Sequence, residues 1–264
     1  MRSLRFEYET RLDFSCCVTE HSFSLRCMPF SDGRQTVAEP ICEISPEPES
    51  VWYSRDSFGN TVICGKSNQP HLSFSFRVYG EASIVNSNKV IGSAQPFYRF
   101  YSPLTQPGEA LTEFYAQHRP KSIGVLARAE ELCNSVYENM TYKKGCTGVY
   151  TTAEAAMKMK AGVCQDYAHI LLSLLRTDGI CCRYVAGLAF ESGETHAWVE
   201  VNDGGGWIGI DPTNNRFISD SSIKLCHGAI IPTARLSGVS ILETLSAFKP
   251  CIQGYRKSEK GKSK

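Results

Sequence analysis

Along the first hundred residues, apolar side chains recur at nearly every second position. Residues 6–14 alternate between mostly apolar and charged side chains, and the segments 22–27 and 71–78 repeat the alternation. A period of two is typical of a strand with one buried face. Runs rich in Gly, Pro, Asp and Ser separate these segments and predict turns at residues 31–33, 45–48 and 56–60. Several short strands with such turns predict a β-sandwich domain over residues 1–95.

The hydrophobic period changes after residues 96–107, a proline-containing segment that we interpret as a linker. Beyond this linker, apolar residues follow helical spacing between Leu111 and Cys133. Thr151 and Glu154 have the Thr-x-x-Glu spacing of a capping box, which predicts the start of a further helix.

A last helix is predicted over residues 164–177, and Gly179 favours the left-handed conformation that ends a helix. Three strands follow, with glycines 204–206 as the turn before the third; they cover residues 182–190, 196–201 and 207–211. Helices followed by antiparallel strands predict an α+β fold, with a second domain over residues 108–250.

Composition and charge narrow the class of protein. The 264 residues are 42% hydrophobic and 21% charged, which is typical of a globular chain, and the formal net charge is +1. A nearly neutral chain has no strong electrostatic attraction for nucleic acid or membranes, so we expect neither as a partner. We interpret residues 251–264 as a basic, flexible tail.

The expected location is the cytoplasm. No stretch reaches the roughly 18 apolar residues of a membrane span, and the N-terminal residues lack the apolar core of a signal peptide. Thiols stay reduced in that compartment, so the twelve cysteines are expected to be free. None of them forms a CxxC pair, which argues against zinc and redox motifs.

Cys164 is the strongest candidate for a reactive thiol. It lies at the predicted start of the helix 164–177, where the free N–H groups and the helix dipole favour a thiolate. Ala168, Leu171 and Leu175 share its helical face, so the sulfur is expected at the end of a buried stripe. Taken alone, however, a cysteine in this position is most often structural.

His196 and Asp211 are the candidate partners of this thiol. His196 opens one predicted strand, and Asp211 ends the next, just before a proline. Antiparallel pairing of these strands would bring imidazole and carboxylate together, so that the carboxylate holds the ring in the right tautomer. A thiol, a base and an orienting group in this order predict nucleophilic catalysis. A zinc site built from the same three side chains would lack a fourth ligand.

The other histidines fit this chemistry less well. His169 is five residues after Cys164 and points elsewhere on the helix. It shares a polar stripe with Asp166, Ser173, Arg176 and Thr177, which we interpret as a solvated face.

Five segments resemble, in order, the motifs of the bacterial transglutaminase-like superfamily, whose members are often described as cysteine proteases. They are residues 151–155, 162–169, 183–187, 196–200 and 207–213. The first half resembles the N-terminal region of the same family at residues 25–29, Gln35 and residues 56–60. The resemblance implies a papain-like, transglutaminase-like catalytic core after an N-terminal β-sandwich. It assigns the nucleophile, base and orienting group to Cys164, His196 and Asp211.

Two features depart from the pattern of the family. Papain-like enzymes have a glutamine six residues before the nucleophile that helps form the oxyanion hole, whereas residue 158 is Lys here. Residues 226–239 match only loosely. The resemblance to calcium-dependent transglutaminases is remote, and we predict neither a metal nor a cofactor.

The predicted activity is acyl transfer through a covalent acyl-enzyme. The substrate would be a peptide, another amide or a thioester, and hydrolysis of a peptide or other amide bond is the preferred outcome. Amide formation with an amine is the alternative, because both outcomes use the same three residues. A binding module that keeps the fold without catalysis is the third possibility. The sequence does not indicate the oligomeric state.

Overall fold

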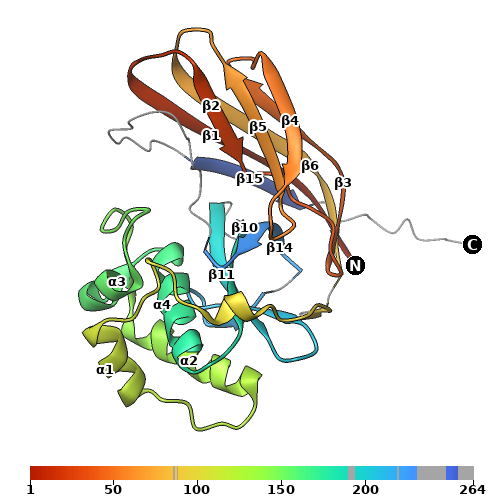
Figure 1. The fold of residues 1–264 in the computed structure, drawn as a ribbon. Helices are drawn as coiled ribbons and strands as arrows, with labels where there is room; N and C mark the ends of the chain where they lie inside the picture. Colours follow the sequence, from red (N-terminus) through yellow and green to blue (C-terminus); the bar gives the residue numbers. More distant parts are fainter. Residues whose placement is uncertain (86, 88, 190–193, 219, 231–247, 255–264) are drawn as a thin grey trace, which may run out of the picture.

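The fold is known from a computed structural model, which describes residues 1–85, 87, 89–189, 194–218, 220–230 and 248–254. It confirms the predicted α+β class, with β-sheets first and a core of helices and strands after them (Figure 1). In the described part of the chain, no helix has the length and apolar character needed to cross a membrane.

The N-terminal region consists of two antiparallel sheets. The larger sheet has the strand order β15-β1-β6-β3, with β15 (Phe248–Gly254), β1 (Arg2–Val18), β6 (His71–Ile84) and β3 (Gln35–Ser45). The smaller has the order β2-β5-β4, with β2 (His21–Leu25), β5 (Thr61–Ser67) and β4 (Ser50–Arg55). The alternating segments of the sequence thus form strands, as predicted, and their apolar side chains line the core between the sheets.

Strand β15 differs from the sequence interpretation. The predicted second domain ended at residue 250 and a flexible tail began at 251, whereas residues 248–254 form a strand that pairs along β1. The chain therefore returns to the N-terminal sheet after completing the core. Such pairing between residues more than 230 positions apart leaves no local signal. The rest of the predicted tail, 255–264, lies outside the described residues.

The predicted linker is packed onto the core. It begins with a short 3₁₀ helix, η1 (Pro96–Arg99). Just before it, strand β7 (Lys89–Val90), which lies within the predicted first domain, pairs instead with the core strand Trp207–Asp211. Tyr98 is buried, with its ring 5.2 Å from the ring of Trp207, and Thr105 is fully buried. The segment therefore fixes one side of the core.

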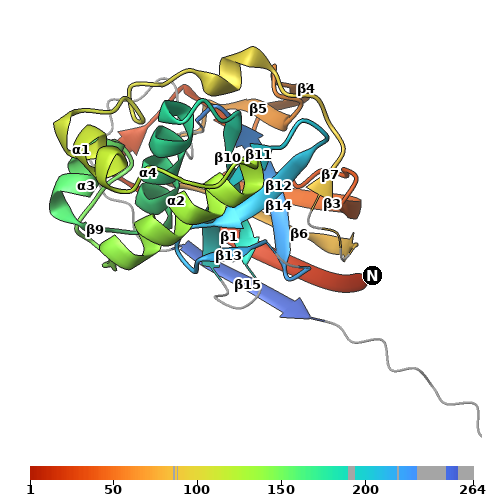
Figure 2. The same cartoon turned by 90° about the horizontal axis from the view of Figure 1, so that it is seen from below.

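Four helices cover one face of the core sheet (Figure 2). They are α1 (Glu109–Gln117), α2 (Val125–Asn139), α3 (Ala153–Met159) and α4 (Cys164–Thr177). Helix α4 has the predicted bounds. Gly179 follows it with a φ of 76°, in the left-handed region that the sequence suggested for the end of this helix.

The start of α3 corrects one local prediction. Its N-cap is Thr152, whose side chain accepts a hydrogen bond from Ala155 N, and not Thr151. Glu154 does not complete a capping box. Its carboxylate instead accepts hydrogen bonds at 3.0–3.1 Å from the free N–H groups at the start of α1, including Ala110 N and Leu111 N. One glutamate thereby joins two helices.

The core sheet is antiparallel, with the order β13-β12-β11-β10-β14. Its strands are β13 (Arg216–Phe217), β12 (Trp207–Asp211), β11 (Glu194–Asn202), β10 (Cys182–Ala189) and β14 (Ser222–Gly228). The predicted antiparallel pairing of β11 with β12 is present, with Val199 opposite Ile210 and Asn202 opposite Trp207. A small parallel pair, β8 (Thr141–Tyr142) and β9 (Ala161–Gly162), lies just before α4.

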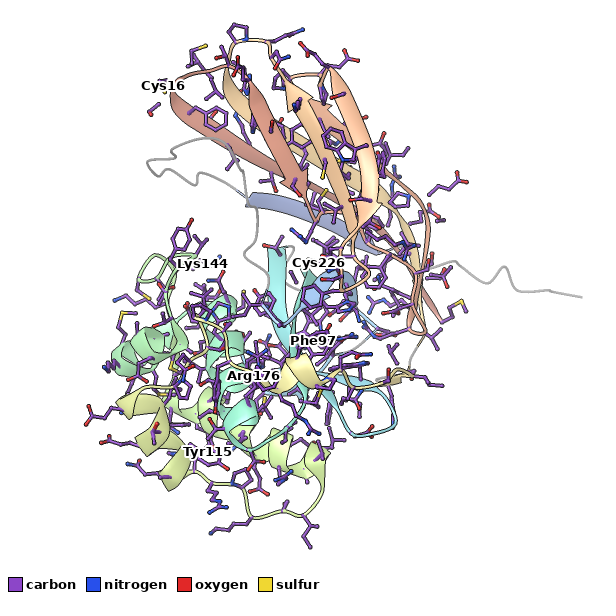
Figure 3. All side chains as sticks on the ribbon, viewed as in Figure 1. Cys16, Phe97, Tyr115, Lys144, Arg176 and Cys226 are labelled. Atoms are coloured by element: carbon purple, nitrogen blue, oxygen red, sulfur yellow. The ribbon has the colours of Figure 1, made fainter. Side chains whose placement is uncertain are left out.

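The two parts of the chain share one core. A single cluster of buried apolar side chains extends from Leu4 in β1 to Cys226 in β14, and Figure 3 shows Cys226 where the N-terminal strands meet the core sheet. Side-chain amides extend this contact. Gln35 exchanges two 2.8 Å hydrogen bonds with the backbone of Lys224, and Asn60 bonds the backbone of His227 at 2.7 and 2.8 Å. They occupy the free edge of β14, as a neighbouring strand would.

The polar stripe of α4 is buried except at Thr177, which is exposed, so its interpretation as a solvated face was wrong for the other four residues. Asp166, His169, Ser173 and Arg176 are each less than 5% exposed. Arg176 donates to the Thr105 hydroxyl at 2.8 Å and to a backbone carbonyl just after β14 at 2.7 Å. Segments distant in sequence thus cover a face that looked solvated when only the helix was considered.

Candidate active site

Cys164 is the first residue of α4. Its thiol is partly exposed, whereas the residues below it on the same helical face, Ala168, Leu171 and Leu175, are fully buried. The sulfur therefore lies where the apolar core reaches the surface, as the sequence predicted. The free N–H groups and the positive end of the helix dipole are at this position.

Asp166 holds the backbone on which Cys164 is placed. Its Oδ2 atom accepts hydrogen bonds from Val163 N at 2.7 Å and from the Thr147 hydroxyl at 2.6 Å. A Cβ atom on Gly162 would overlap the Asp166 side chain, so a glycine is required for this close approach. The carboxylate thereby ties the loop before α3 to the turn that leads into α4.

His196 lies on β11 opposite Gly187 of β10. The Trp198 ring covers Gly187 from the same face of the sheet, and a Cβ atom at Gly187 would overlap both this ring and the Ile223 carbonyl oxygen. Trp198 is buried, and its ring lies 6.5 Å from the imidazole. The tryptophan therefore forms a fixed apolar wall beside the histidine.

The imidazole of His196 is bound to Asp211, the last residue of β12. His196 Nε2 and Asp211 Oδ2 are 2.8 Å apart. Asp211 is buried and accepts two further hydrogen bonds, from Thr213 N to Oδ1 at 2.9 Å and from the Asn214 amide to Oδ2 at 2.7 Å. The turn after β12 thus fixes the carboxylate, and the carboxylate fixes the ring.

The Cys164 thiol also acts on this imidazole, because hydrogen bonding to the thiol and its negative charge contribute to the raised pKa of His196. Because Nε2 is bound to Asp211, Nδ1 is the ring nitrogen left for the sulfur. The structure therefore joins the predicted base directly to the predicted orienting group, and Cys164 is the thiol that acts on this ring.

Electrostatics favours a charged imidazole at this position. Burial alone would lower the pKa of His196, but the hydrogen bonds to Asp211 and Cys164 and the negative charge of both partners outweigh it and raise the pKa to about 10. For Asp211, burial alone would raise the pKa, but the hydrogen bond to His196 and the positive charge of the ring lower it overall. Imidazolium and carboxylate thus stabilise each other.

Tyr184 on β10 is a buried phenol whose charge state responds to Cys164. Its pKa is raised well above the usual value, first by burial and then by the negative charge of Cys164 and other neighbours. The hydroxyl group is therefore neutral. Its hydrogen cannot be lost as a proton at physiological pH, so the group can act only as a neutral donor or acceptor.

Lys158, which replaces the glutamine of papain-like enzymes, does not face this site. Its side chain is 60% exposed, and its Nζ atom pairs with Glu154 at 3.3 Å. The described residues therefore identify the backbone N–H of Cys164 as one candidate oxyanion donor and provide no side chain at position 158 as the second.

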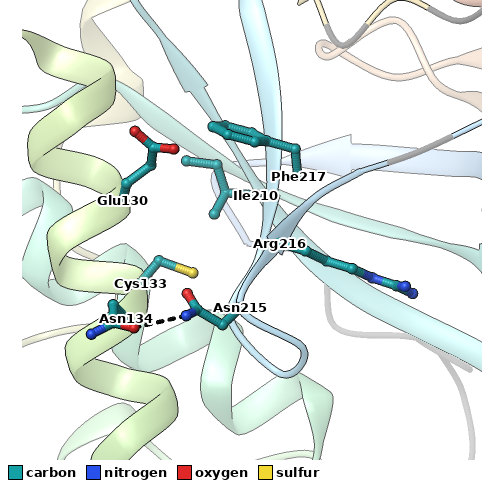
Figure 4. Close-up of a pocket in the computed structure, with 7 residues that line it drawn as sticks. All are labelled: Glu130, Cys133, Asn134, Ile210, Asn215, Arg216 and Phe217. Carbon is teal, nitrogen blue, oxygen red and sulfur yellow. Dashed lines mark hydrogen bonds between the residues drawn. The ribbon is translucent and has the colours of Figure 1, made fainter.

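A pocket of ≈ 380 Å³ lies between α2 and the strands β12 and β13 (Figure 4). It is lined by Glu130, Cys133, Asn134, Ile210, Asn215, Arg216 and Phe217. Asn215 donates to the Asn134 side chain at 2.8 Å across the rim, and Cys133 Sγ is 3.7 Å from the backbone oxygen of Asp211. The pocket is thus behind Asp211, and Cys164 does not line it.

No group of three or more His, Cys, Asp or Glu side chains suited to a metal ion occurs among the described residues. Eleven cysteines of that part of the chain, Cys164 included, are free thiols.

Comparisons with known proteins identify the class. Residues 112–212 match the transglutaminase-like superfamily, and residues 4–83 match the bacterial transglutaminase-like N-terminal region. The chain therefore carries a transglutaminase-like core preceded by the N-terminal region of the bacterial proteins.

Individual relatives agree over most of the chain. An uncharacterized protein of Mycobacterium leprae is 26% identical, with 86% of this chain and 89% of the relative covered. An uncharacterized protein of Mycobacterium tuberculosis is 24% identical, with 85% and 82% covered. The crystal structure of "a Putative Cysteine Protease from Cytophaga hutchinsonii" superposes with a TM-score of 0.78 at 17% identity, over 97% of this chain and 91% of that one. This likeness shows a shared fold.

Sequence reasoning missed three residues that shape the site. Asn214 binds the carboxylate of Asp211, and its only sequence signal was its place in the turn that Asp211-Pro212 opens. Gly187 could have been suspected as a glycine inside a strand, which often marks a close approach. Asp166 was assigned to solvent, although its position three residues after Val163 is that of a capping side chain.

Proposed function

We propose that this chain is a thiol-dependent acyl-transfer enzyme that hydrolyses a peptide or other amide bond. Cys164 is the nucleophile, His196 the base and acid, and Asp211 the group that orients His196. The proposal is supported by one observation: the imidazole of His196 is 2.8 Å from a buried carboxylate, and its pKa is raised by that carboxylate and by a thiol at a helix N-terminus. The transglutaminase-like match of residues 112–212 supports the same chemistry.

The reaction would begin from a thiolate and an imidazolium. The sulfur attacks the carbonyl carbon, and the C–N bond breaks as His196 gives its proton to the leaving amine. This forms a thioester on Cys164. His196, now neutral, takes a proton from water as the water oxygen attacks the thioester. The carboxylic acid leaves, and the thiolate and imidazolium are restored.

Asp211 acts through His196 in this scheme. Its hydrogen bond to Nε2 keeps Nδ1 directed at the sulfur and stabilises the positive ring. Asn214 and Thr213 N donate two further hydrogen bonds to the carboxylate, one to each oxygen, which hold Asp211 in this orientation. Each proton transfer is then confined to the thiol side of the ring.

Amide formation is a second candidate because the matched family is transglutaminase-like. The first half-reaction is the same, but an amine replaces water in the second. The two outcomes differ in which acceptor reaches the thioester, and this is decided by the acceptor site and not by Cys164, His196 or Asp211.

Mass spectrometry of the intact protein tests the proposal. The protein is mixed with acyl donors of two classes, acyl thioesters and peptide amides, and the mixture is quenched in acid. A single acyl group on Cys164, absent in Cys164→Ala and retained in Cys146→Ala, is expected. Cys146 is the matched control because its thiol is also partly exposed. Acylation that persists in Cys164→Ala would contradict the proposal.

A chase of the acylated protein separates the two outcomes. Loss of the acyl group in buffer alone, with release of the free acid, supports hydrolysis. Loss only after addition of primary amines, with formation of the amide, supports amide formation. Absence of any acyl adduct with every donor class would favour a non-catalytic module.

A further inference from the structure

Strand β11 has one neighbour that ends early. Strand β10 pairs along it as far back as Glu194, whereas β12 pairs with it only from Val199 onward. Strand β12 ends at Asp211, and Pro212 begins a turn. Within the described part of the chain, the first half of β11, which carries His196, therefore has no neighbouring strand on the side of β12.

The backbone groups of Thr195 point to this free edge. At the other end of β11, Asn202 N donates to Cys181 O at 2.9 Å, on the side of β10. The next residue, Asp203, donates from its N–H to Gly206 O at 3.2 Å, on the side of β12. Since N–H and C=O groups alternate in direction along a strand, those of the odd-numbered residues face β12. Thr195 is one of them, and it lies beyond the end of β12.

Both groups of Thr195 lack a hydrogen-bonding partner among the described residues. The turn after β12 does not provide one, because it folds back on Asp211 through the amide of Asn214. The next outward-facing residue, Ala197, is only 3% exposed, and the register of the two strands would place it opposite Pro212, which has no N–H. Thr195 is partly exposed, so its free backbone groups are the ones that a ligand can reach.

Strand β14 shows how this protein fills an edge with its own side chains. There, the buried amides of Gln35 and Asn60 take the positions of a neighbouring strand. No side chain of the described residues does the same at Thr195. An open edge of this kind is suited to an extended chain that adds itself to the sheet through main-chain hydrogen bonds.

The position of the edge indicates what pairs with it. Thr195 directly precedes His196, so a chain bound there is held beside the base of the proposed reaction. A hydrogen-bonded antiparallel pair uses the N–H and the C=O of one residue on each strand. The matching ligand therefore carries both groups on one residue, as every position of a peptide except proline does. An acetyl thioester or a simple amide does not.

We propose that Thr195 binds the backbone of an extended peptide acyl donor, and that peptides are the substrate class of this site. The inference rests on the proposed function, because it takes His196 as the base. Thr195 N–H donates to a carbonyl oxygen of the peptide, and Thr195 C=O accepts the N–H of the same peptide residue. Thr195 thus aligns the substrate and takes no part in bond making. These two bonds do not select among peptide side chains.

Peptide thioesters test this pairing, because the position of their reacting carbonyl is known. A short alanine-based peptide thioester is compared with the acetyl thioester of the same thiol, and acylation of Cys164 is followed by mass spectrometry after an acid quench. Pairing at Thr195 is expected to make the peptide acylate about tenfold faster at low concentration. Each peptide N–H is then removed in turn by an ester in place of the amide. One position is expected to lose about five- to tenfold in rate. Its two neighbours, whose N–H groups point away, are expected to lose little.

Variants of Thr195 test the protein side. Thr195→Pro removes the outward N–H and none of the bonds to β10, because that N–H does not face β10. It is expected to lower the preference for the peptide over the acetyl thioester about fivefold. Thr195→Val keeps both backbone groups and is expected to retain the single sensitive position. Thermal unfolding reports whether each variant is folded, and the ester scan of the wild type stands without them.

The outcomes separate this inference from the proposed function. If the acetyl thioester acylates Cys164 and the peptide has no advantage, the inference is overturned and the proposed function stands. An ester scan with no sensitive position, or with losses at adjacent positions, also overturns the inference. Absence of acylation by both donors overturns the two together.

Discussion

Two clusters of buried charges lie on the core sheet, and they differ in how completely each charge is neutralised. In the candidate site, the imidazole of His196 is bound to the buried Asp211, and the thiol of Cys164, which also acts on the pKa of the ring, is partly exposed. In the second cluster, Lys224 and Glu200 are joined at 2.7 Å with both side chains buried. One cluster contains a proton that can move, whereas the other contains fixed ions.

The second cluster joins the core sheet to the N-terminal region. Lys224 also pairs with Asp32 at 3.1 Å, and Arg183 binds the other oxygen of Glu200 at 2.6 Å while its guanidinium lies 4.0 Å from the Trp207 ring. Burial would raise the pKa of Glu200, but the positive charges of Lys224 and Arg183 lower it to about 2. This carboxylate therefore stays ionised across the physiological range.

The comparison shows what separates a reactive site from a structural ion cluster. Both contain a buried carboxylate beside a cation. In the ion cluster every charge has a fixed partner of opposite sign, so no proton is transferred. In the site, the cation is an imidazole that can release its proton, and the thiol is accessible to a reactant. We therefore expect substitutions in the candidate site to affect catalysis and substitutions in the ion cluster to affect stability.

The largest expected effect is that of Asp211→Asn. The amide keeps the size of the carboxylate but removes its charge and favours the wrong tautomer of His196, so the acylation rate is expected to fall by about 10³–10⁴. Asp203→Asn is the matched control, because Asp203 follows β11 and pairs with Lys89 at the surface. Stopped-flow acylation measures both. A fall below tenfold in Asp211→Asn would show that Asp211 does not orient the ring.

Lys224→Met is expected to act on stability and not on the thiol. It leaves Glu200 with one cation fewer in a buried setting, which costs about 3–5 kcal/mol of unfolding free energy. Lys89→Met removes the exposed pair with Asp203 and is expected to cost at most about 1 kcal/mol. Urea unfolding measures both costs. Under conditions in which the variant remains folded, alkylation of Cys164 should be unchanged; if it falls, the two clusters are coupled.

The next largest expected effect is a loss of stability as the pH is lowered. Burial lowers the pKa of His169 from 6.5 to about 4 and that of His227 to about 3. Below pH 6.5 the unfolded chain therefore binds protons that the folded chain does not. As the pH is lowered, the free energy of unfolding therefore decreases, by up to about 1.4 kcal/mol per pH unit for each histidine. The raised pKa of His196 acts in the opposite direction: its contribution is full below pH 6.5 and is lost toward pH 10.

Urea unfolding between pH 7 and pH 4 measures this slope. His169→Gln is expected to reduce this slope by the contribution of one histidine, because the glutamine side chain does not bind a proton in this pH range. An equal slope in the variant and the wild type would mean that His169 does not resist protonation in the folded protein.

The smallest expected effect is that of Asn214→Ala. The variant removes one hydrogen bond to Asp211 and leaves the other two. If that hydrogen bond stabilises the orientation of Asp211 by about 1–1.5 kcal/mol, its loss corresponds to roughly a tenfold slower acylation. Because Asn214 would act through Asp211, the double variant Asn214→Ala/Asp211→Asn should be no slower than Asp211→Asn alone. Additive losses would show that Asn214 contacts the substrate directly.

Local patterns predicted the elements that carry the site. The helix 164–177 was predicted with its observed bounds, because the apolar stripe and Gly179 mark it within one segment. The strands of His196 and Asp211 and their antiparallel pairing followed from alternation and the glycine turn. What the sequence could not provide was distant pairing: Glu154 with α1, and β15 with β1.

The buried polar face of α4 illustrates the same limit. From the helix alone, Asp166 and Arg176 belong with solvent, since charged residues rarely lie inside a protein. Their partners come from Thr147 and Thr105, on segments whose position only the tertiary fold defines. The cytoplasmic location and the absence of nucleic-acid and membrane partners stay predictions.

Alkylation of cysteines as a function of pH tests the central claim most directly. Cys16 and Cys17 are exposed, whereas Cys164 is only partly so; if accessibility alone governed the reaction, iodoacetamide would label Cys16 and Cys17 first. An ion pair with His196 predicts that peptide mapping at about pH 6 finds Cys164 labelled fastest, and that His196→Ala abolishes this advantage. Slow labelling of Cys164 that rises with pH like that of Cys16, in the wild type and in His196→Ala alike, would contradict the account.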